Sequence, residues 1–428
     1  MLVNIIKSKL FKDTALYSII NIIDKAIPFL IMPIISRTLS KEDMGCYSLY
    51  QVTFQILIPI ITLSLDYPIS INYFKMNRND FSSYFSTGMV LVLIIYALLT
   101  LVGIGFSSQL SNIFGLEDKW LQITFIIIIL NYFNQLRMNL WRIQKDPYHF
   151  GLFSVPLALI KNVLGLMFIM CFDFGWEGII IGHLIGQVLF AIIAIYTFIS
   201  QKYLFLCFCK QYVFDFFKVG VPISIHKISA WLTTSVNRII VYSILGTAAT
   251  GSFGIGAAFG TIVTVIEDAV NKAYSPYLFE KLAKYNNKSA SSIVRLISFY
   301  YACFILLGCF ISIVGYWGVG IIFGDKYLDT RSFVIPIIVG AVINGLYKIH
   351  VNIIFFTKKT YIVARNTIFC AIINVCSAYF LVGKMGLLGA AYSTTFTELV
   401  LYVLTLYYAN QQYNLPWQLV LSRKLKKE

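Results

Sequence analysis

Four basic side chains lie inside long apolar stretches of the sequence, namely Lys25, Lys161, Lys227 and Arg238. A charge at the centre of a bilayer costs roughly 2.5 to 3.5 kcal/mol by insertion scales, so such residues usually face a wet cavity and mark a pathway. Arg offers a bidentate fork to phosphate and Lys a mobile point charge, so the four together would suit an anionic ligand. The alternative is ion pairing or extension of the side chain to the membrane interface, and it has more weight for Lys161 and Lys227 than for Lys25 and Arg238.

Polar residues accompany these cations at helical spacing. If the stretch 216–244 is one helix, Lys227, Thr234 and Arg238 share a face, and His226 and Asn237 lie beside it. Asn21 precedes Lys25 by one helical turn. We expect Asn21, His226 and Asn237 to join the four cations in binding a ligand, because amide and imidazole groups can form hydrogen bonds with polar groups of a ligand. His183 is more simply a packed or hydrogen-bonded side chain.

Five acidic residues are candidates for coupling to a proton or a sodium ion, since a carboxyl group in a low-dielectric medium can exchange protons. Structural ion pairing is an equal alternative for each of them. Asp66 is the first candidate because it follows Gln51, Gln55 and Thr62 along one polar stripe. The others are Asp24, Glu267, Asp268 and Glu398.

The elements that position these groups must be membrane helices. The 428 residues are 58% hydrophobic and only 12% charged, with a mean hydropathy of +0.77, whereas soluble proteins are about 25% charged. The net charge of +15 is spread over short loops, which argues against nucleic acid as a partner. The eight cysteines show no metal-binding spacing, and no phosphate-binding loop for ATP is present, so we predict no metal and no cofactor.

Spanning the hydrocarbon takes about 20 apolar residues, and this length predicts twelve transmembrane helices in an all-α polytopic membrane protein. The predicted spans are 14–35, 46–73, 85–106, 120–141, 151–172, 176–199, 216–244, 250–273, 293–316, 332–356, 361–382 and 386–409. The first is read as an uncleaved span, because no small-residue cleavage site follows it.

The loop charges predict the orientation. Lys and Arg in both termini and in the loops after even-numbered spans outnumber those in the other loops by about four to one, which indicates that both termini are cytoplasmic. No loop is long enough to hold a catalytic domain.

Three short segments recur in the same order about half a chain apart: Leu39–Tyr47 with Leu245–Phe253, Lys145–Tyr148 with Lys358–Tyr361, and Gly175–Gly178 with Gly386–Gly389. This duplication predicts two six-helix lobes, 1–208 and 209–428. Because six is even, the lobes should be related by a pseudo-two-fold axis along the membrane normal.

Three motifs carry a family resemblance. They are Pro33-Ile34-Ile35-Ser36-Arg37-Thr38-Leu39-Ser40 with Glu42-Asp43-Met44-Gly45-Cys46-Tyr47; Gly220-Val221-Pro222 with Trp231, Asn237-Arg238 and Thr250-Gly251-Ser252-Phe253-Gly254-Ile255; and Gly386-Leu387-Leu388-Gly389-Ala390-Ala391. Over its whole length the chain resembles the polysaccharide transporter family, the Wzx-type O-antigen flippases of the multidrug/oligosaccharidyl-lipid/polysaccharide (MOP) exporter superfamily. It departs at Asn237, where the family often has an acid before the arginine.

The resemblance implies a MATE-like fold in the bacterial inner membrane and no enzymatic activity. It also implies a substrate, an undecaprenyl-pyrophosphate-linked oligosaccharide such as an O-antigen repeat unit, which would cross to the periplasmic leaflet by alternating access through a cationic lumen. Membrane lipids, the polysaccharide polymerase and the chain-length machinery would be its partners. Two alternatives stay open. An exporter of drugs or organic cations would need an acidic lumen, and a membrane glycan polymerase would need a large extracytoplasmic loop.

Overall fold

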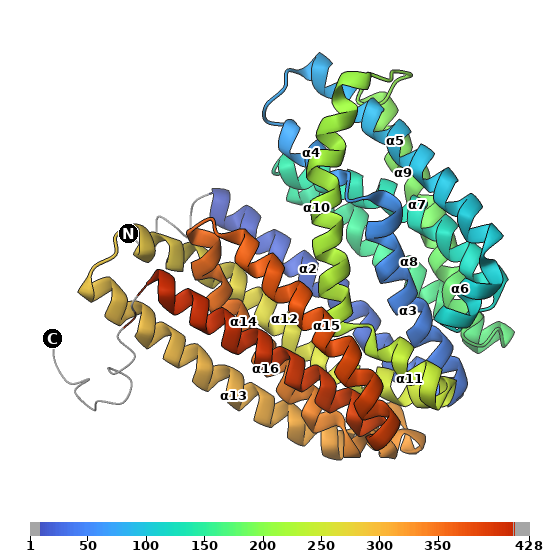
Figure 1. Cartoon of the computed structure of the whole chain (residues 1–428). Coiled ribbons are helices and arrows are strands. Elements are labelled where there is room, and N and C mark those ends of the chain that lie inside the picture. The colour runs from blue at the N-terminus through green and yellow to red at the C-terminus, as the bar shows by residue number, and fades with distance from the viewer. Residues whose placement is uncertain (1–8, 414, 416–428) are drawn as a thin grey trace. The chain divides into compact units, whose positions relative to one another are not determined.

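The computed structural model describes residues 9–413 and 415, and regular secondary structure in this part of the chain is entirely helical (Figure 1). The prediction of an all-α fold is therefore confirmed. The helices are α2 (Lys9–Thr38), α3 (Lys41–Thr62), α4 (Asp66–Asn72), α5 (Arg78–Gly105), α6 (Ser107–Phe114), α7 (Asp118–Ile143), α8 (Pro147–Phe172), α9 (Glu177–Ser200), α10 (Lys210–Thr234), α11 (Asn237–Leu245), α12 (Thr247–Ala283), α13 (Asn287–Phe323), η1 (Asp325–Ser332), α14 (Val334–Phe356), α15 (Thr360–Met385) and α16 (Leu387–Gln412).

Ten of the described helices are long and apolar enough to cross a membrane, and the broken pair α10 and α11 makes an eleventh candidate. The chain is thus a multi-pass membrane protein. The twelfth expected span, 120–141, is a helix of suitable length, α7, but it is too polar to qualify on hydropathy. The expected cytoplasmic termini fall at residues 1–8 and 416–428, outside the described residues.

Two expected spans are broken rather than continuous. Within the span 46–73, helix α3 ends at Thr62 and α4 begins at Asp66. Between them, Leu63 and Ser64 have left-handed backbone angles, with φ of 43° and 50°. A β-carbon at Gly220 of α10 would lie 2.4 Å from the Leu63 carbonyl oxygen, so this close approach needs glycine. The break sets the position of Asp66.

The span 216–244 is broken between α10 and α11, around Ser235 and Val236. The expectation that Lys227 and Arg238 lie on one face of a continuous helix is therefore wrong. A regular 3.6-residue period applies only while the backbone stays helical.

The chain divides into two compact units, Met1–Trp231 and Leu232–Glu428. The first unit includes most of α10, which the sequence assigned to the second lobe. Trp231 Nε1 donates to the Val52 carbonyl oxygen at 3.0 Å, and Asp215 accepts from the Tyr84 hydroxyl at 2.6 Å. These contacts tie α10 to α3 and α5, while the repeat boundary at 208/209 stays a prediction.

The motif at Leu39–Asp43 has a clear structural purpose. The Ser40 hydroxyl accepts from the Asp43 backbone N–H at 2.9 Å, and Asp43 Oδ2 accepts from the Ser40 backbone N–H at 3.3 Å. This reciprocal capping box satisfies backbone donors at the start of α3.

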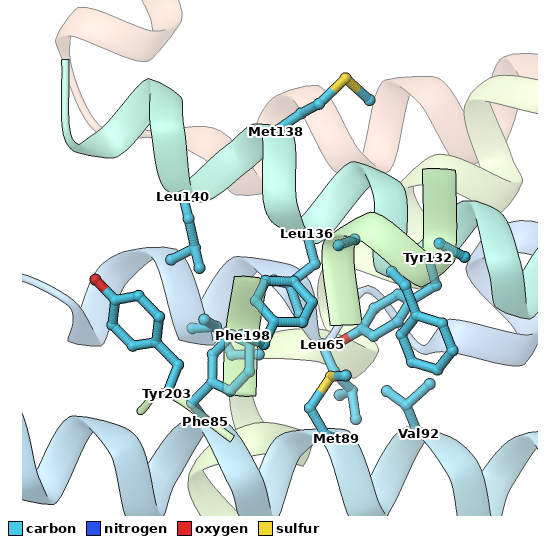
Figure 2. Close-up of a cluster of buried hydrophobic side chains, with 14 of the residues drawn as sticks. Leu65, Phe85, Met89, Val92, Tyr132, Leu136, Met138, Leu140, Phe198 and Tyr203 are labelled. Atoms are coloured by element: carbon cyan, nitrogen blue, oxygen red, sulfur yellow. The ribbon is translucent and has the colours of Figure 1, made fainter. Parts of the chain in front are cut away.

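Apolar side chains of the first unit hold α7 against α5 and α9. Figure 2 shows Leu136 and Leu140 of α7 directed toward Phe85 and neighbouring side chains of α5. The Phe85 and Phe198 rings meet edge to face, with centroids 5.0 Å apart. This face of α7 is buried in the apolar core. The polar residues on the opposite side of α7 therefore face a cavity.

Candidate functional site

A cavity of about 670 Å³ lies within the first unit. Side chains from six helices line it, and most of them are polar. They are Phe54, Ile58 and Thr62 of α3; Asp66, Tyr67 and Ser70 of α4; Asn131, Tyr132, Gln135, Asn139, Arg142 and Ile143 of α7; Lys161 of α8; His183 of α9; and Lys227 of α10.

The charge of this lining is positive. Three cations, Arg142, Lys161 and Lys227, face the cavity together with one carboxylate, Asp66. Lys227 Nζ lies 4.9 Å from the centre of the Tyr67 ring, a cation–π distance. An anionic group entering the cavity would therefore meet more positive than negative charge.

Glycines on α9 determine where Lys161 lies. A β-carbon at Gly186 would be 2.9 Å from the Lys161 β-carbon, and one at Gly182 would be 2.3 Å from the Gly165 backbone nitrogen. The four-residue spacing of these glycines lets α8 and α9 pack backbone to backbone, as small residues do in membrane helices. This contact holds the start of the Lys161 side chain at the helix interface beside the cavity.

One face of α7 supplies the amide groups. Asn131, Gln135, Asn139 and Arg142 follow one another at helical spacing and all line the cavity. Asn139 Nδ2 donates to Asp66 Oδ2 at 3.3 Å, and Arg142 donates to Asn139 Oδ1 at 2.9 Å. This stripe is not among the residues predicted to bind a ligand, although its spacing within an otherwise apolar run was a signal in the sequence.

A hydrogen-bond chain leads from the cavity into the interior at His183. Its Nδ1 contacts the Tyr50 hydroxyl, and its Nε2 lies 3.1 Å from Gln187 Nε2. Gln187 Oε1 accepts from Asn134 at 2.6 Å, so the Gln187 amino group is the donor to His183. The His183 ring is thus a neutral acceptor at Nε2 and carries its proton at Nδ1. The expectation of a hydrogen-bonded histidine is confirmed.

The predicted residues of α2 lie elsewhere in the first unit. Lys25 is exposed on the surface, and Asn21 Nδ2 donates to the Tyr17 carbonyl oxygen at 2.7 Å. Asp24 lies against Ser154 and within electrostatic range of Lys161. None of these α2 residues is among the cavity-lining side chains.

Three further residues predicted to bind a ligand are not among the side chains that line the cavity. His226 is exposed on α10, and Arg238 is half-buried on α11. Asn237 is buried, donates to Thr394 Oγ1 at 2.6 Å, and accepts from Asn374 at 3.1 Å. These bonds join α11 to α15 and α16, so a role for Asn237 in binding a ligand stays a prediction.

The structure gathers the acidic candidates of the second unit. Lys348 Nζ lies 2.9 Å from Asp268 Oδ1 and 3.5 Å from Glu267 Oε2. Asn344 donates to Glu398 Oε2 at 2.8 Å. Asn352, one helical turn after Lys348 on α14, donates to Asn271 at 2.7 Å. The eight cysteines are free thiols, and the described residues contain no group of three or more metal-ligating side chains.

Sequence comparison identifies a protein family and bacterial relatives. A family model described as polysaccharide biosynthesis protein matches residues 10–282, which include every residue that lines the cavity. A Haemophilus influenzae protein named for the Lsg locus is 22% identical over 381 residues, covering 86% of this chain and 90% of the relative. An uncharacterized membrane protein of the same organism is 23% identical over 405 residues, covering 91% and 92%.

Solved structures with the same fold are membrane transporters. The lipid II flippase MurJ in an inward closed conformation superposes with a TM-score of 0.76 at 15% identity, covering 92% of this chain and 87% of that chain. An inward-facing multidrug resistance transporter of the MATE family in the MOP superfamily gives a TM-score of 0.71 at 14% identity, covering 91% and 97%. The chain belongs to the polysaccharide biosynthesis protein family and has the fold shared by MATE transporters and MurJ.

Proposed function

We propose that this protein is a flippase for an undecaprenyl-pyrophosphate-linked oligosaccharide, an O-antigen repeat unit or a related surface glycan. The substrate would pass from the cytoplasmic to the periplasmic leaflet of the bacterial inner membrane. The observation that carries the proposal is the cavity that combines three cations with a stripe of amides.

The pyrophosphate of the proposed substrate would account for the cations that line the cavity. A doubly charged head group loses its hydration on entering the membrane, and this loss is prohibitive without compensating charge. Arg142 can form a fork with phosphate oxygens, and Lys161 and Lys227 can add mobile point charges. The cavity would lower the barrier by replacing water around the anion.

The glycan of the proposed substrate would account for the amide side chains that line the cavity. Sugar hydroxyls both donate and accept hydrogen bonds, and Asn131, Gln135 and Asn139 offer both groups along one helix face. The cavity volume of about 670 Å³ is comparable with that of small-molecule sites, so a longer glycan would need the cavity to widen during transport. Bending at the α3–α4 break is one source of that widening.

The alternatives fit less well. An organic-cation exporter would favour an acidic lining, whereas Asp66 is the one carboxylate among these lining residues. A glycan polymerase would need a long loop outside the membrane, and the described connections are short, with 201–209 between α9 and α10 among the longest.

Alternating access, with Asp66 as the first candidate for ion coupling, completes the proposal. A proton or sodium ion at Asp66 would change the charge of the lining, and an ion drives a change of state only if it binds the two states unequally. Lys25, His226 and Arg238 remain proposed contacts for other stages of the cycle. Both termini would be cytoplasmic, and the polymerase and chain-length machinery would receive the product.

The substrate class can be tested with the full-length protein in vesicles. Three probes are compared: the lipid-linked oligosaccharide, the same lipid pyrophosphate without sugar, and a lipophilic organic cation. A membrane-impermeant enzyme that modifies the glycan reports its arrival in the other leaflet. Protein-dependent transfer of the glycan probe supports the proposal, and export of the organic cation alone would overturn it.

A further inference from the structure

A buried acidic cluster lies inside the second unit, apart from the cavity described above. Glu267 and Asp268 come from α12, Lys348 from α14 and Glu398 from α16. These helices pack directly against one another, α14 touching both α12 and α16. Asp268 and Glu267 therefore contact one lysine, and Glu398 lies within electrostatic range of it.

Burial differs sharply among the four side chains. Glu267 is 1% exposed and Glu398 is 3% exposed. The Asp268 and Lys348 side chains are 41% and 22% exposed. Lys348 lies closer to the exposed Asp268, at 2.9 Å, than to Glu267, at 3.5 Å. One positive charge is thus shared with the outer carboxylate, and it cannot balance both buried carboxyl groups as well.

Glu267 also has an oxygen without a donor. Within the described part of the chain, Glu267 Oε1 is buried and accepts no hydrogen bond. The α14 backbone lies directly beside it, since a β-carbon at Gly345 would be 2.4 Å from this oxygen. A buried carboxylate oxygen in such surroundings would be strongly disfavoured, whereas a carboxylic acid would not carry the charge.

Other groups around the pair do not supply a second cation. Asn344 of α14 donates to Glu398 Oε2, and Tyr347 of α14 and Cys370 of α15 lie within electrostatic range of Glu398. On α13 and α16, the Tyr301 and Tyr402 hydroxyls are 2.7 Å apart, and Tyr301 lies 2.6 Å from His350 Nε2. Of the groups with described contacts to the two glutamates, only Lys348 is positively charged.

We propose that Glu267 and Glu398 hold one exchangeable proton between them, forming a proton site in the second unit. Two buried carboxylates within electrostatic range repel each other, and a single proton removes that repulsion, so the proton belongs to the pair. Asp268 and Lys348 connect the pair to the exposed end of the cluster and give the proton a route out. That the proton exchanges during transport rests on the proposed flippase function, whereas its presence does not.

Infrared spectroscopy tests the proton directly, without any transport. The purified full-length protein in lipid nanodiscs is titrated with base while the carbonyl stretch of protonated carboxyl groups is recorded. Glu267→Gln and Glu398→Gln are compared with Glu280→Gln, an exposed glutamate of the same helix α12. We expect the band to lose intensity in at least one of the first two variants and to keep it in the control. A band unchanged in both would overturn the proposal.

Lys348→Met supplies a second measurement if the glutamate variants fold poorly. Removal of the cation should force an additional carboxyl group to remain protonated, so the band should gain intensity. No gain in a folded Lys348→Met protein would contradict the proposed charge balance.

Vesicle transport separates the two proposals. If both hold, an imposed pH gradient changes the flipping rate of the wild type, and Glu267→Gln flips at a rate that no longer responds to the gradient. If the wild type moves no lipid-linked glycan, the flippase proposal fails while the infrared result stands. If flipping ignores the gradient in the wild type, exchange of the proton during transport is refuted.

Discussion

Gly186 of α9 lies against Lys161 of α8 so closely that a β-carbon at position 186 would be 2.9 Å from the lysine β-carbon and 3.2 Å from its Cα atom. The residue that supplies charge to the cavity therefore depends on a residue that has no side chain. This contact leads to the first prediction.

Gly182→Ala should destabilise the first unit by about 1 to 3 kcal/mol, the usual effect of overpacking. Its β-carbon would meet the Gly165 backbone nitrogen at 2.3 Å, and backbone atoms cannot rotate away. Gly186→Ala should cost less, because its β-carbon would lie 2.9 to 3.2 Å from Lys161 atoms, which is a milder overlap than the 2.3 Å at Gly182. Thermal unfolding in detergent measures both. The matched control is Gly105→Ala, where nothing lies within 4 Å, and an equal loss there would refute the packing argument.

Lys161→Ala and Lys227→Ala should each slow flipping of a lipid-linked glycan by about tenfold or more, because a hydrogen bond to a charged group contributes about 1.5 to 3 kcal/mol. Lys75→Ala, which removes an exposed cation between α4 and α5, is the control. Rates are measured in vesicles at equal amounts of inserted protein. Full activity of both cavity variants would remove the cationic cavity from the mechanism.

Lys25→Ala and Arg238→Ala test whether the pathway extends beyond the cavity. We expect loss of surface glycan in cells that carry either variant, because the sequence places both cations within apolar runs. Arg238→Lys should retain part of the activity, since the charge survives while the fork is lost. Wild-type glycan levels in both alanine variants, with normal protein insertion, would confine the substrate contacts to the first-unit cavity.

Asp66→Asn should leave the fold intact and remove the dependence of flipping on an imposed proton or sodium gradient. Asparagine keeps the shape and can still bond Asn139, but it cannot exchange a proton or bind a cation by charge. Vesicles with either gradient, or none, distinguish the ions. A variant that still responds to the gradient as the wild type does would exclude Asp66 as the coupling residue.

Single cysteines test the predicted orientation. With the native cysteines replaced, a cysteine at Ser289 should be protected from a membrane-impermeant reagent in intact cells, because the basic segment around the start of α13 should be cytoplasmic. A cysteine at Lys326, in η1, should be labelled from outside. The reverse pattern would invert the topology.

Hydropathy was sufficient to establish the class of protein and where along the chain the long helices lie. Burial of backbone and side chains in lipid depends on the local sum of apolar residues, so each expected span is occupied by helical segments. Even α7, which is too polar to qualify as a span, was placed correctly along the chain. The motif at Ser40 and Asp43 likewise acts locally, through a capping box.

Which charged residues share a site was decided by tertiary structure. Lys161 and Lys227 are 66 positions apart in the chain, and they line one cavity because glycines bring α8 to α9 and because α10 packs with the first unit. The sequence ranked Lys25 and Arg238 above them, since membership of an apolar run is visible in one dimension and the neighbours of a helix face are not.

The same reason explains the two breaks and the acidic cluster. The left-handed Leu63 and Ser64 are stabilised by contacts with α10, a helix more than 140 residues away in the sequence, and local propensity gives no sign of them. Glu267 and Glu398 were separate candidates in the sequence, and only the packing of α12, α14 and α16 places them around one lysine. Periodicity determines which residues share a helix face, whereas long-range packing determines which other helices that face contacts.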